Sequence, residues 1–218
     1  MQQAIKILPE ERAERIRKIS LEKSKRQSIA AGLLLEYVLN EHGIQGKNLT
    51  FLKNTDGKPS IKEYPDFHYN LSHSAEYAAL VADGCPVGID IEELRKGYGK
   101  LAERFFSIEE AKVLKEHWSD HLFTKLWTRK ESYLKAVGVG MRMPLEGFSV
   151  LEEQVQVNEK MTLSMIEKDV IYYLASMPFG TAGWLSVCRK GQPIILGQGD
   201  ALLQEVDLKK LKRYKGYV

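Results

Sequence analysis

The sequence lacks several features that would place the protein in a specialised class. It has only two cysteines in 218 residues, Cys85 and Cys188, too few for a disulfide framework or a cysteine-based zinc site. It has no apolar run of about 18 residues, so we expect no transmembrane helix. Its first residues lack the apolar stretch of a signal peptide. These absences favour a cytoplasmic protein that does not act on membranes and keeps its thiols reduced and buried.

An excess of charge of one sign is also missing. Lys and Arg number 32 and Asp and Glu 29, which leaves a net charge of +3 and argues against a nucleic-acid partner. Hydrophobic residues make up 44% and charged residues 28% of the chain, a composition that buries a core and excludes intrinsic disorder. Walker and nucleophile-elbow motifs are absent too. The class of protein that these exclusions leave is a globular protein of one or two domains.

Hydrophobic periodicity predicts helices followed by strands, twice along the chain. We expect helices over 10–19 and 21–40, a capping box at 107–110 that begins another, and a long helix over 120–136. Strands are expected at 50–53, 60–61, 77–82, 87–91, 148–157, 161–166, 170–175, 183–187 and 194–196. The charged, glycine-rich stretch 93–104 predicts a surface connection. The expected fold is α+β, with two halves, residues 1–104 and 105–218, and a cleft between them.

The hexapeptide Val87-Gly-Ile-Asp-Ile-Glu92 alternates apolar and acidic residues. In a strand, alternate side chains point to opposite faces, so Asp90 and Glu92 share one face, about 7 Å apart, and the isoleucines share the other. Two such carboxylates could bind Mg²⁺, which prefers oxygen ligands and often shares them with substrate phosphates. The alternative is an amphipathic strand with a solvated acidic face.

A second cluster of charged residues lies in the predicted helix over 120–136. Lys130, Glu131 and Lys135 follow one another closely, and Glu131 and Lys135 are four residues apart, on neighbouring parts of one helix surface. They could bring a carboxylate and two positive charges to a site. The alternative is an ordinary helix ion pair, worth ~0.3–0.5 kcal/mol.

Two further motifs are weaker. In Asn70-Leu-Ser-His-Ser74, adjacent serine and histidine rarely reach the geometry of a hydrolase nucleophile, so Ser72 and His73 are better suited to bonding phosphate oxygens. Gly57-Lys-Pro59 is by itself only a turn that carries a lysine.

The order of these motifs is more specific than any one of them. With Arg104-Phe-Phe-Ser107, Gly138-Val-Gly140, Pro144-Leu145 and Phe148-Ser-Val150, they resemble the 4′-phosphopantetheinyl transferases of the surfactin-synthetase-activating type, over about residues 10–187. The resemblance implies two α+β halves related by pseudo-twofold symmetry, with the active site between them. The length matches the two-halved class, which is monomeric.

The resemblance also implies an activity. Such enzymes transfer the 4′-phosphopantetheine group of coenzyme A to a serine of an apo acyl or peptidyl carrier protein and release adenosine 3′,5′-bisphosphate. For this chain it implies coenzyme A as substrate, Mg²⁺ as cofactor and an apo carrier protein as partner.

Roles for single residues follow from the resemblance. The magnesium ligands would be Asp90, Glu92 and Glu131. Glu131 would take the proton of the carrier serine, directly or through a water, and Lys135 would stabilise the departing phosphate. The other coenzyme A contacts, besides Asp90, would come from polar and basic side chains: Lys130 and Lys135 at the pyrophosphate, Ser72 and His73 at phosphate oxygens, Lys58 and Pro59 at the adenine, and Arg12, Arg15 and Arg26 at the 3′-phosphate.

A carrier protein presents an acidic helix beside its serine, so we expect a basic and apolar docking surface near the cleft mouth. Its expected residues are Lys96, Lys100, Leu101, Arg104, Phe105, Lys112 and Lys115. A solvated connection is the alternative for this stretch. Glu110 also matches an acidic position of the family. The resemblance leaves two roles open for it, a direct catalytic role and a structural one in the capping box.

Two other functions use the same residues. A nuclease or phosphatase would need a second aspartate cluster for a two-metal site. A non-catalytic coenzyme A or carrier-binding protein would have no need of three acidic residues for a magnesium ion.

Overall fold

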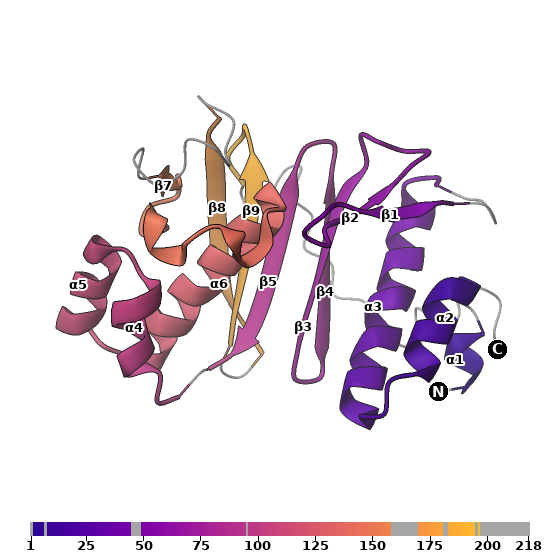
Figure 1. Cartoon of the computed structure of the whole chain (residues 1–218), viewed down its shortest axis with the longest axis horizontal. Helices are drawn as coiled ribbons and strands as arrows, with labels where there is room; N and C mark the ends of the chain where they lie inside the picture. The colour runs from indigo at the N-terminus through magenta and orange to yellow at the C-terminus, as the bar shows by residue number, and fades with distance from the viewer. Residues whose placement is uncertain are drawn as a thin grey trace.

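The computed structural model describes residues 2–6, 8–44, 49–94, 96–157, 170–180, 183–194 and 196, without the side chains of residues 3, 99, 100, 103 and 141. The fold is α+β, with the strands in the middle of the molecule and helices at both ends (Figure 1). The helices are α1 (Gln2–Ile5), α2 (Glu10–Arg17), α3 (Glu22–Glu41), α4 (Gly99–Phe105), α5 (Ile108–Glu116) and α6 (Asp120–Val137), with 3₁₀ turns η1 (Gly140–Arg142) and η2 (Leu145–Gly147).

The strands all pair antiparallel. β1 pairs with β2, β3 with β4 and β6 with β7, while β5, β9 and β8 form a three-stranded sheet in that order. Their bounds are β1 (Phe51–Lys53), β2 (Pro59–Ile61), β3 (His68–Ser74), β4 (Tyr77–Asp83), β5 (Val87–Glu93), β6 (Phe148–Ser149), β7 (Gln156–Val157), β8 (Tyr172–Phe179) and β9 (Gly183–Lys190).

The N-terminal part of the molecule is built around α3. Its apolar residues recur at helical spacing, so the helix has a face to bury. Leu35 and Leu39 pack with Ile61 and Tyr69 in one buried cluster, and the opposite side of α3 packs against α1 and α2. Helix α3 thereby supports the β3–β4 hairpin from one side.

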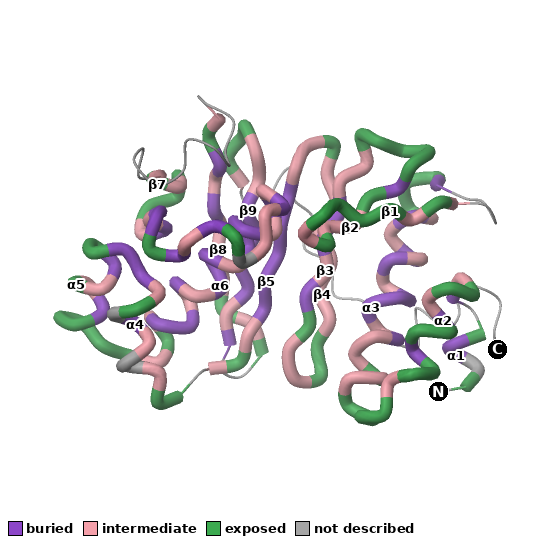
Figure 2. Tube along the Cα trace, viewed as in Figure 1, coloured by how far each residue is buried: buried purple, intermediate pink, exposed green. Residues whose placement is uncertain are grey.

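The C-terminal part is built around α6, which lies against β5 and β9. Phe123, Tyr133 and Ala136 of α6 are fully buried. The buried stretches in Figure 2 concentrate accordingly on α6 and on the strands beside it. Gly88 permits the close approach of β5, because a Cβ atom there would lie 2.1 Å from the backbone oxygen of Ser132.

Side chains of β3 join the β3–β4 hairpin to β5. Alternate polar residues of β3 accept hydrogen bonds from alternate backbone N–H groups of β5: Asn70 from Ile89 at 2.9 Å, Ser72 from Ile91 at 3.3 Å and Ser74 from Glu93 at 3.2 Å. The period of two along each strand makes this possible, since residues 70, 72 and 74 share one face. The face of β3 that meets β5 is therefore polar.

Most predicted elements are confirmed. The helices at 10–19, 21–40 and 120–136 correspond to α2, α3 and α6, and the capping box of Ser107 and Glu110 begins α5. Gly138 ends α6 with φ = +80°, a left-handed conformation that favours glycine. The predicted strand over 161–166 lies outside the described residues.

Four predictions differ from the structure. One is the strand expected at 194–196, where neither Ile194 nor Leu196 lies in a strand. The stretch 93–104 is not only a connection, because α4 begins at Gly99 and buries Ala102. Strand β3 was not expected, and residues 148–157 form two short strands with a loop between them. The predicted division at residue 104 stays a prediction. Backbone hydrogen bonds join β5, which precedes this residue, to β9, which follows it.

Cysteines and membrane spans complete the comparison. Cys188 is buried and Cys85 half-buried, and both are free thiols. Among the described helices, none combines the length and the apolar character that crossing a membrane requires.

Candidate active site

A cavity lies where the β3–β4 hairpin, β5 and α6 meet. Three separate stretches of the sequence line it: Leu71, Ser72 and His73 of β3, Asp90 and Glu92 of β5, and Trp127, Glu131 and Lys135 of α6. The three α6 residues are spaced four apart and so share one face of the helix. The cavity therefore combines three carboxylates with one lysine, one histidine and one serine.

Asp90 is the most buried acidic residue of the cavity, with 4% of its surface exposed. Its Oδ1 atom accepts hydrogen bonds from Lys135 Nζ at 2.6 Å and from Ser72 Oγ at 2.9 Å. Its Oδ2 atom is buried and has no hydrogen-bond partner among the described residues. Burial raises the pKa of Asp90, and the charge of Lys135 opposes this effect.

Glu92 is held by a residue that the sequence analysis did not assign. Ser74 Oγ donates to Glu92 Oε2 at 3.1 Å, two residues along β3 from the matching contact of Ser72 with Asp90. Both serines also accept from the backbone of β5. Each serine thus fixes one carboxylate of the cavity.

The three carboxylates suit a divalent cation, although they are not gathered around one point. Within the described ranges, no group of three or more His, Cys, Asp and Glu side chains is close enough together to hold a metal ion. Asp90, Glu92 and Glu131 nevertheless line one cavity, and Asp90 keeps a buried oxygen without a partner. Carboxylate oxygens are the ligands that Mg²⁺ prefers. The donor set therefore fits Mg²⁺.

Lys130 lies away from the cavity, which corrects the expected contact with pyrophosphate. Its side chain has no exposed surface and pairs with Glu110, equally buried, at 2.7 Å. It also donates to the backbone oxygens of Leu145 and Phe148 at 2.7 Å each. Because these acceptors hold the ammonium inside the core, Lys130 has a structural role in this arrangement.

Lys58 and Pro59 also lie elsewhere, which does not agree with a contact to adenine in this cavity. Lys58 Nζ donates to the carbonyl oxygen of Ala136, and Asn54 Nδ2 donates to that of Gly138 at 2.7 Å. The turn between β1 and β2 thus satisfies carbonyls at the C-terminal end of α6 that have no helical partner. Burial lowers the pKa of Lys58 to about 8. Pro59 begins β2.

The basic residues expected at the 3′-phosphate lie on the N-terminal helices. Arg15 on α2 and Arg26 on α3 are exposed. Arg12 is half-buried between α2 and α3, where its Cδ atom would lie 2.9 Å from a Cβ atom added at Gly32. Burial lowers the pKa of Arg12, and Tyr69 opposes this effect. None of the three arginines is among the residues that line the described cavity.

The structure therefore brings together six of the predicted site residues. They are Ser72, His73, Asp90, Glu92, Glu131 and Lys135. It adds Leu71 and Trp127 to the lining, and Ser74 and Gly88 as residues that position the site. The polar residues at positions 70, 72 and 74 of Asn70-Leu-Ser-His-Ser74 are the sequence signal that could have placed Ser74 on the same strand face as Ser72.

Fold and cavity together define an α+β protein with an acidic site that suits a divalent cation and a phosphate-bearing substrate. Two family models match adjoining parts of the chain, which together span residues 1–176. The model described as "4'-phosphopantetheinyl transferase, N-terminal" matches residues 1–85, and that described as "4'-phosphopantetheinyl transferase superfamily" matches residues 86–176. The chain belongs to the 4′-phosphopantetheinyl transferase superfamily, which confirms the resemblance inferred from its motifs.

Individual relatives agree with this assignment. A 4'-phosphopantetheinyl transferase of Bacillus subtilis is 38% identical over 112 residues, half of each chain. The 4'-phosphopantetheinyl transferase Sfp of Bacillus subtilis (strain 168) is 34% identical over 158 residues, which cover 70% of both chains. Among solved structures, the ACPS-CoA complex of Chronobacterium ammoniagenes matches 49% of this chain and 98% of its own, at 19% identity and a TM-score of 0.37.

Proposed function

We propose that the protein transfers the 4′-phosphopantetheine group of coenzyme A to a serine of an apo acyl or peptidyl carrier protein and releases adenosine 3′,5′-bisphosphate. The family supports this reaction class, and two thirds or more of the relative Sfp matches this chain. One structural observation carries the proposal. Asp90 and Glu92 of β5 and Glu131 of α6 line the same cavity as Lys135, and a buried oxygen of Asp90 has no hydrogen-bond partner among the described residues.

The cavity would hold Mg²⁺ on the carboxylates of Asp90, Glu92 and Glu131. When bound, the ion would neutralise charge on the pyrophosphate of coenzyme A. Ser72 and Ser74 keep two of these carboxylates in place through hydrogen bonds at 2.9 and 3.1 Å. Ser72 is buried. Its role as a hydrogen-bond donor to Asp90 is therefore better supported than its predicted contact with phosphate.

His73 and Lys135 are the donors that face the cavity for the phosphates. His73 is exposed and lines the cavity, and its side chain lies on the opposite face of β3 from Ser72 and Ser74. Lys135 brings a full positive charge from α6. Positive groups beside a departing phosphate stabilise the negative charge that grows on it.

The reaction forms one bond and breaks one. The hydroxyl oxygen of the carrier serine attacks the phosphorus that carries the pantetheine arm, and the bond from this phosphorus to the bridging oxygen of the pyrophosphate breaks. The electron pair leaves with adenosine 3′,5′-bisphosphate. Glu131, at the centre of the α6 face that lines the cavity, would accept the hydroxyl proton directly or through a water.

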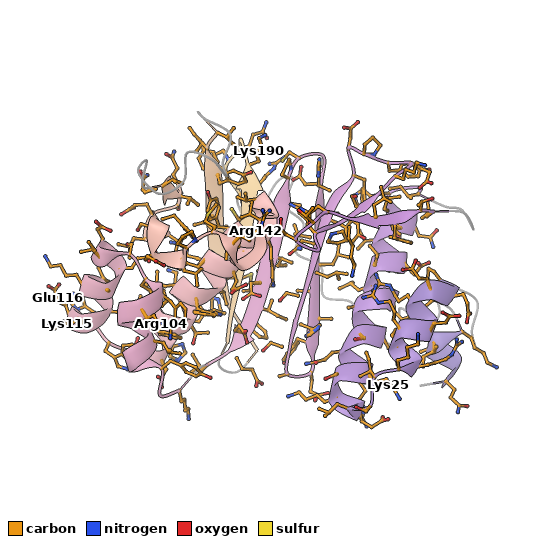
Figure 3. All side chains as sticks on the ribbon, in the orientation of Figure 1. Lys25, Arg104, Lys115, Glu116, Arg142 and Lys190 are labelled. Atoms are coloured by element: carbon orange, nitrogen blue, oxygen red, sulfur yellow. The ribbon has the colours of Figure 1, made fainter. Side chains whose placement is uncertain are left out.

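The C-terminal end of α4 and the helix α5 would dock the carrier protein. Ile108 is 86% exposed, and Lys112 and Lys115 follow it on the same face of α5. Arg104 and Lys115 lie at the α4–α5 end of the molecule in Figure 3. We name Arg104, Ile108, Lys112 and Lys115 the basic surface; an exposed apolar residue among positive charges suits an acidic helix. The side chain of Lys100 lies outside the described residues.

That the enzyme acts as a monomer stays a prediction from the sequence. Its cytoplasmic location, and the absence of membrane and nucleic-acid partners, stay predictions from the sequence.

Intact-mass measurement tests the function. Purified protein, coenzyme A, Mg²⁺ and an apo carrier protein are incubated, and the carrier is expected to gain the mass of one phosphopantetheine group. Asp90→Ala and Glu131→Ala should abolish the gain, whereas Lys53→Met, which removes an exposed charge on β1, should not. An unmodified carrier across a panel of apo acyl and peptidyl carriers would contradict the proposal. Degradation of coenzyme A or nucleic acid without transfer would favour a phosphatase or nuclease.

A further inference from the structure

The ammonium of Lys135 lies beside Asp90, the most buried carboxylate of the cavity. Its Nζ atom is 2.6 Å from Asp90 Oδ1 and 3.2 Å from Ser72 Oγ. Its side chain remains 28% exposed, while that of Asp90 is 6% exposed. A partly exposed lysine therefore contacts a buried carboxylate of the cavity.

We propose that Lys135 is an exchangeable counter-ion of Asp90. In the ligand-free protein the ammonium neutralises this carboxylate; a divalent cation displaces it, and the released ammonium binds the pyrophosphate of coenzyme A. The inference rests on the proposed function and deepens it, because it connects the binding of the cation with the binding of the substrate.

The charges of the cavity support the exchange. Three carboxylates and one ammonium line it, which leaves an excess of two negative charges, the charge that one divalent cation balances. Oδ2 of Asp90 is already buried without a partner among the described residues. Oδ1 is bound by Lys135 and Ser72. A cation that binds Asp90 therefore meets one oxygen that no described residue binds and one that is shared with a competing positive charge.

The side chain of Lys135 can change its position. A lysine ammonium is a compact charge on a flexible four-carbon stem. This one donates to Asp90 and Ser72, and its side chain stays 28% exposed. Lys130, five residues earlier on the same helix, shows the opposite arrangement, with no exposed surface and contacts to Glu110 and two carbonyl oxygens. The two lysines of α6 therefore differ in how far their side chains can move.

Displacement makes the two binding events cooperative. A cation that releases Lys135 raises the affinity for coenzyme A, and by linkage coenzyme A that captures Lys135 raises the affinity for the cation by the same factor. Direct contact between a cation and the pyrophosphate makes a second contribution to this cooperativity, and that contribution does not depend on Lys135. Removal of the lysine separates the two contributions.

Binding of Mn²⁺ alone, followed by electron paramagnetic resonance of the free ion, tests the exchange without any turnover. Without coenzyme A, Lys135→Met should bind Mn²⁺ on the order of tenfold more tightly than the natural protein, a change of about 1.4 kcal/mol. Lys135→Arg keeps the charge and should bind as the natural protein does. Lys53→Met removes the same charge from an exposed position on β1 and is the matched control.

Addition of coenzyme A provides the second arm. Coenzyme A should strengthen Mn²⁺ binding more in the natural protein than in Lys135→Met, because only the natural protein has an ammonium to transfer. Equal or weaker Mn²⁺ binding by Lys135→Met without coenzyme A would overturn the inference, as would the absence of Mn²⁺ binding altogether. The transfer assay decides the proposed function separately, since a protein can modify its carrier whether or not Lys135 competes with the cation.

Discussion

Lys130 Nζ lies 2.7 Å from Glu110 Oε2, and neither side chain has exposed surface. The ammonium also lies 4.2 Å from the centre of the Phe148 ring. Glu110 in turn accepts from the backbone N–H groups of Ser107 and Val150, at 2.8 and 2.7 Å. One buried ion pair thereby ties α5 and the segment after η2 to α6, the helix that carries Glu131.

Loss of Lys130 should destabilise the fold. In Lys130→Met the carboxylate of Glu110 stays buried without its counter-charge, so the free energy of unfolding in urea should fall by about 3–5 kcal/mol. Glu110→Gln combined with Lys130→Met leaves no unpaired charge and should recover part of this loss. Lys125→Met, on the same helix, is the control. Equal stability of the Lys125 and Lys130 variants would contradict the structural role.

Gly88 sets the distance between β5 and α6. In Gly88→Ala the new Cβ would lie 2.1 Å from Ser132 O and 2.4 Å from Ala136 N, both of them backbone atoms. The helix must move away from the strand, which we expect to cost at least the ~1–3 kcal/mol of an overpacked core. The displacement also carries Glu131 away from Asp90, so carrier modification should fall.

Gly84→Ala is the matched control for this substitution. A Cβ atom at Gly84 meets nothing within 4 Å among the described residues, so we expect a change in unfolding free energy within about 0.5 kcal/mol. Thermal unfolding of both variants, with the mass assay on each, provides the comparison. A Gly88 variant as stable and active as the Gly84 variant would show that β5 and α6 do not need this close approach.

Periodicity predicted two of the three elements that carry the site, β5 and α6, and the reason is physical. Asp90 and Glu92 share a face because strands repeat every two residues, and Glu131 and Lys135 share one because helices repeat every 3.6. Such patterns are local, so they can be seen without the partner elements. Family resemblance then supplied the one fact that periodicity cannot, namely that β5 and α6 meet.

Side-chain direction was harder to predict than the elements. Lys130 and Glu131 are adjacent on α6 and point about 100° apart, so the pattern alone does not say which one enters the core. The answer depends on Glu110, which lies 20 positions earlier and closes the buried pair. Strand β3 was missed for a similar reason, because its polar residues at 70, 72 and 74 face another strand instead of water.

Lys58 should make stability depend on pH in the alkaline range. Burial lowers its pKa from 10.5 to about 8 in the folded chain. Between pH 8 and about 10.4 the unfolded chain therefore binds more protons than the folded chain, and the folded state gains stability as pH rises. Below pH 8 both states carry the proton and the gain is absent.

The comparison of Lys58→Met with the natural protein isolates this effect. The melting temperature of the natural protein, minus that of the variant, should increase between pH 8 and pH 10. Lys53→Met removes an exposed lysine from the neighbouring strand β1 and should show a constant difference. A difference for Lys58→Met that falls or stays level over this range would rule out a lowered pKa.

The basic surface predicts a defect confined to one substrate. Arg104 and Lys112 are exposed and lie at the α4–α5 end of the molecule, away from the hairpin that carries Ser72 (Figures 1 and 3). Arg104→Glu with Lys112→Glu should therefore raise the KM for the carrier protein on the order of tenfold at low salt, because opposite charges at an interface steer association. The KM for coenzyme A should stay unchanged.

Charge reversal at the other end of the molecule separates docking from the general effect of net charge. Lys23 and Lys25 lie in the first turns of α3, and Lys25 is labelled at that end in Figure 3. Lys23→Glu with Lys25→Glu changes the net charge equally and should leave the KM for the carrier near that of the natural protein. The defect of the Arg104 and Lys112 variant should also shrink as salt is added, since screening weakens exposed charges. An equal rise in both KM values, or an equal effect of the α3 variant, would show that the carrier docks elsewhere.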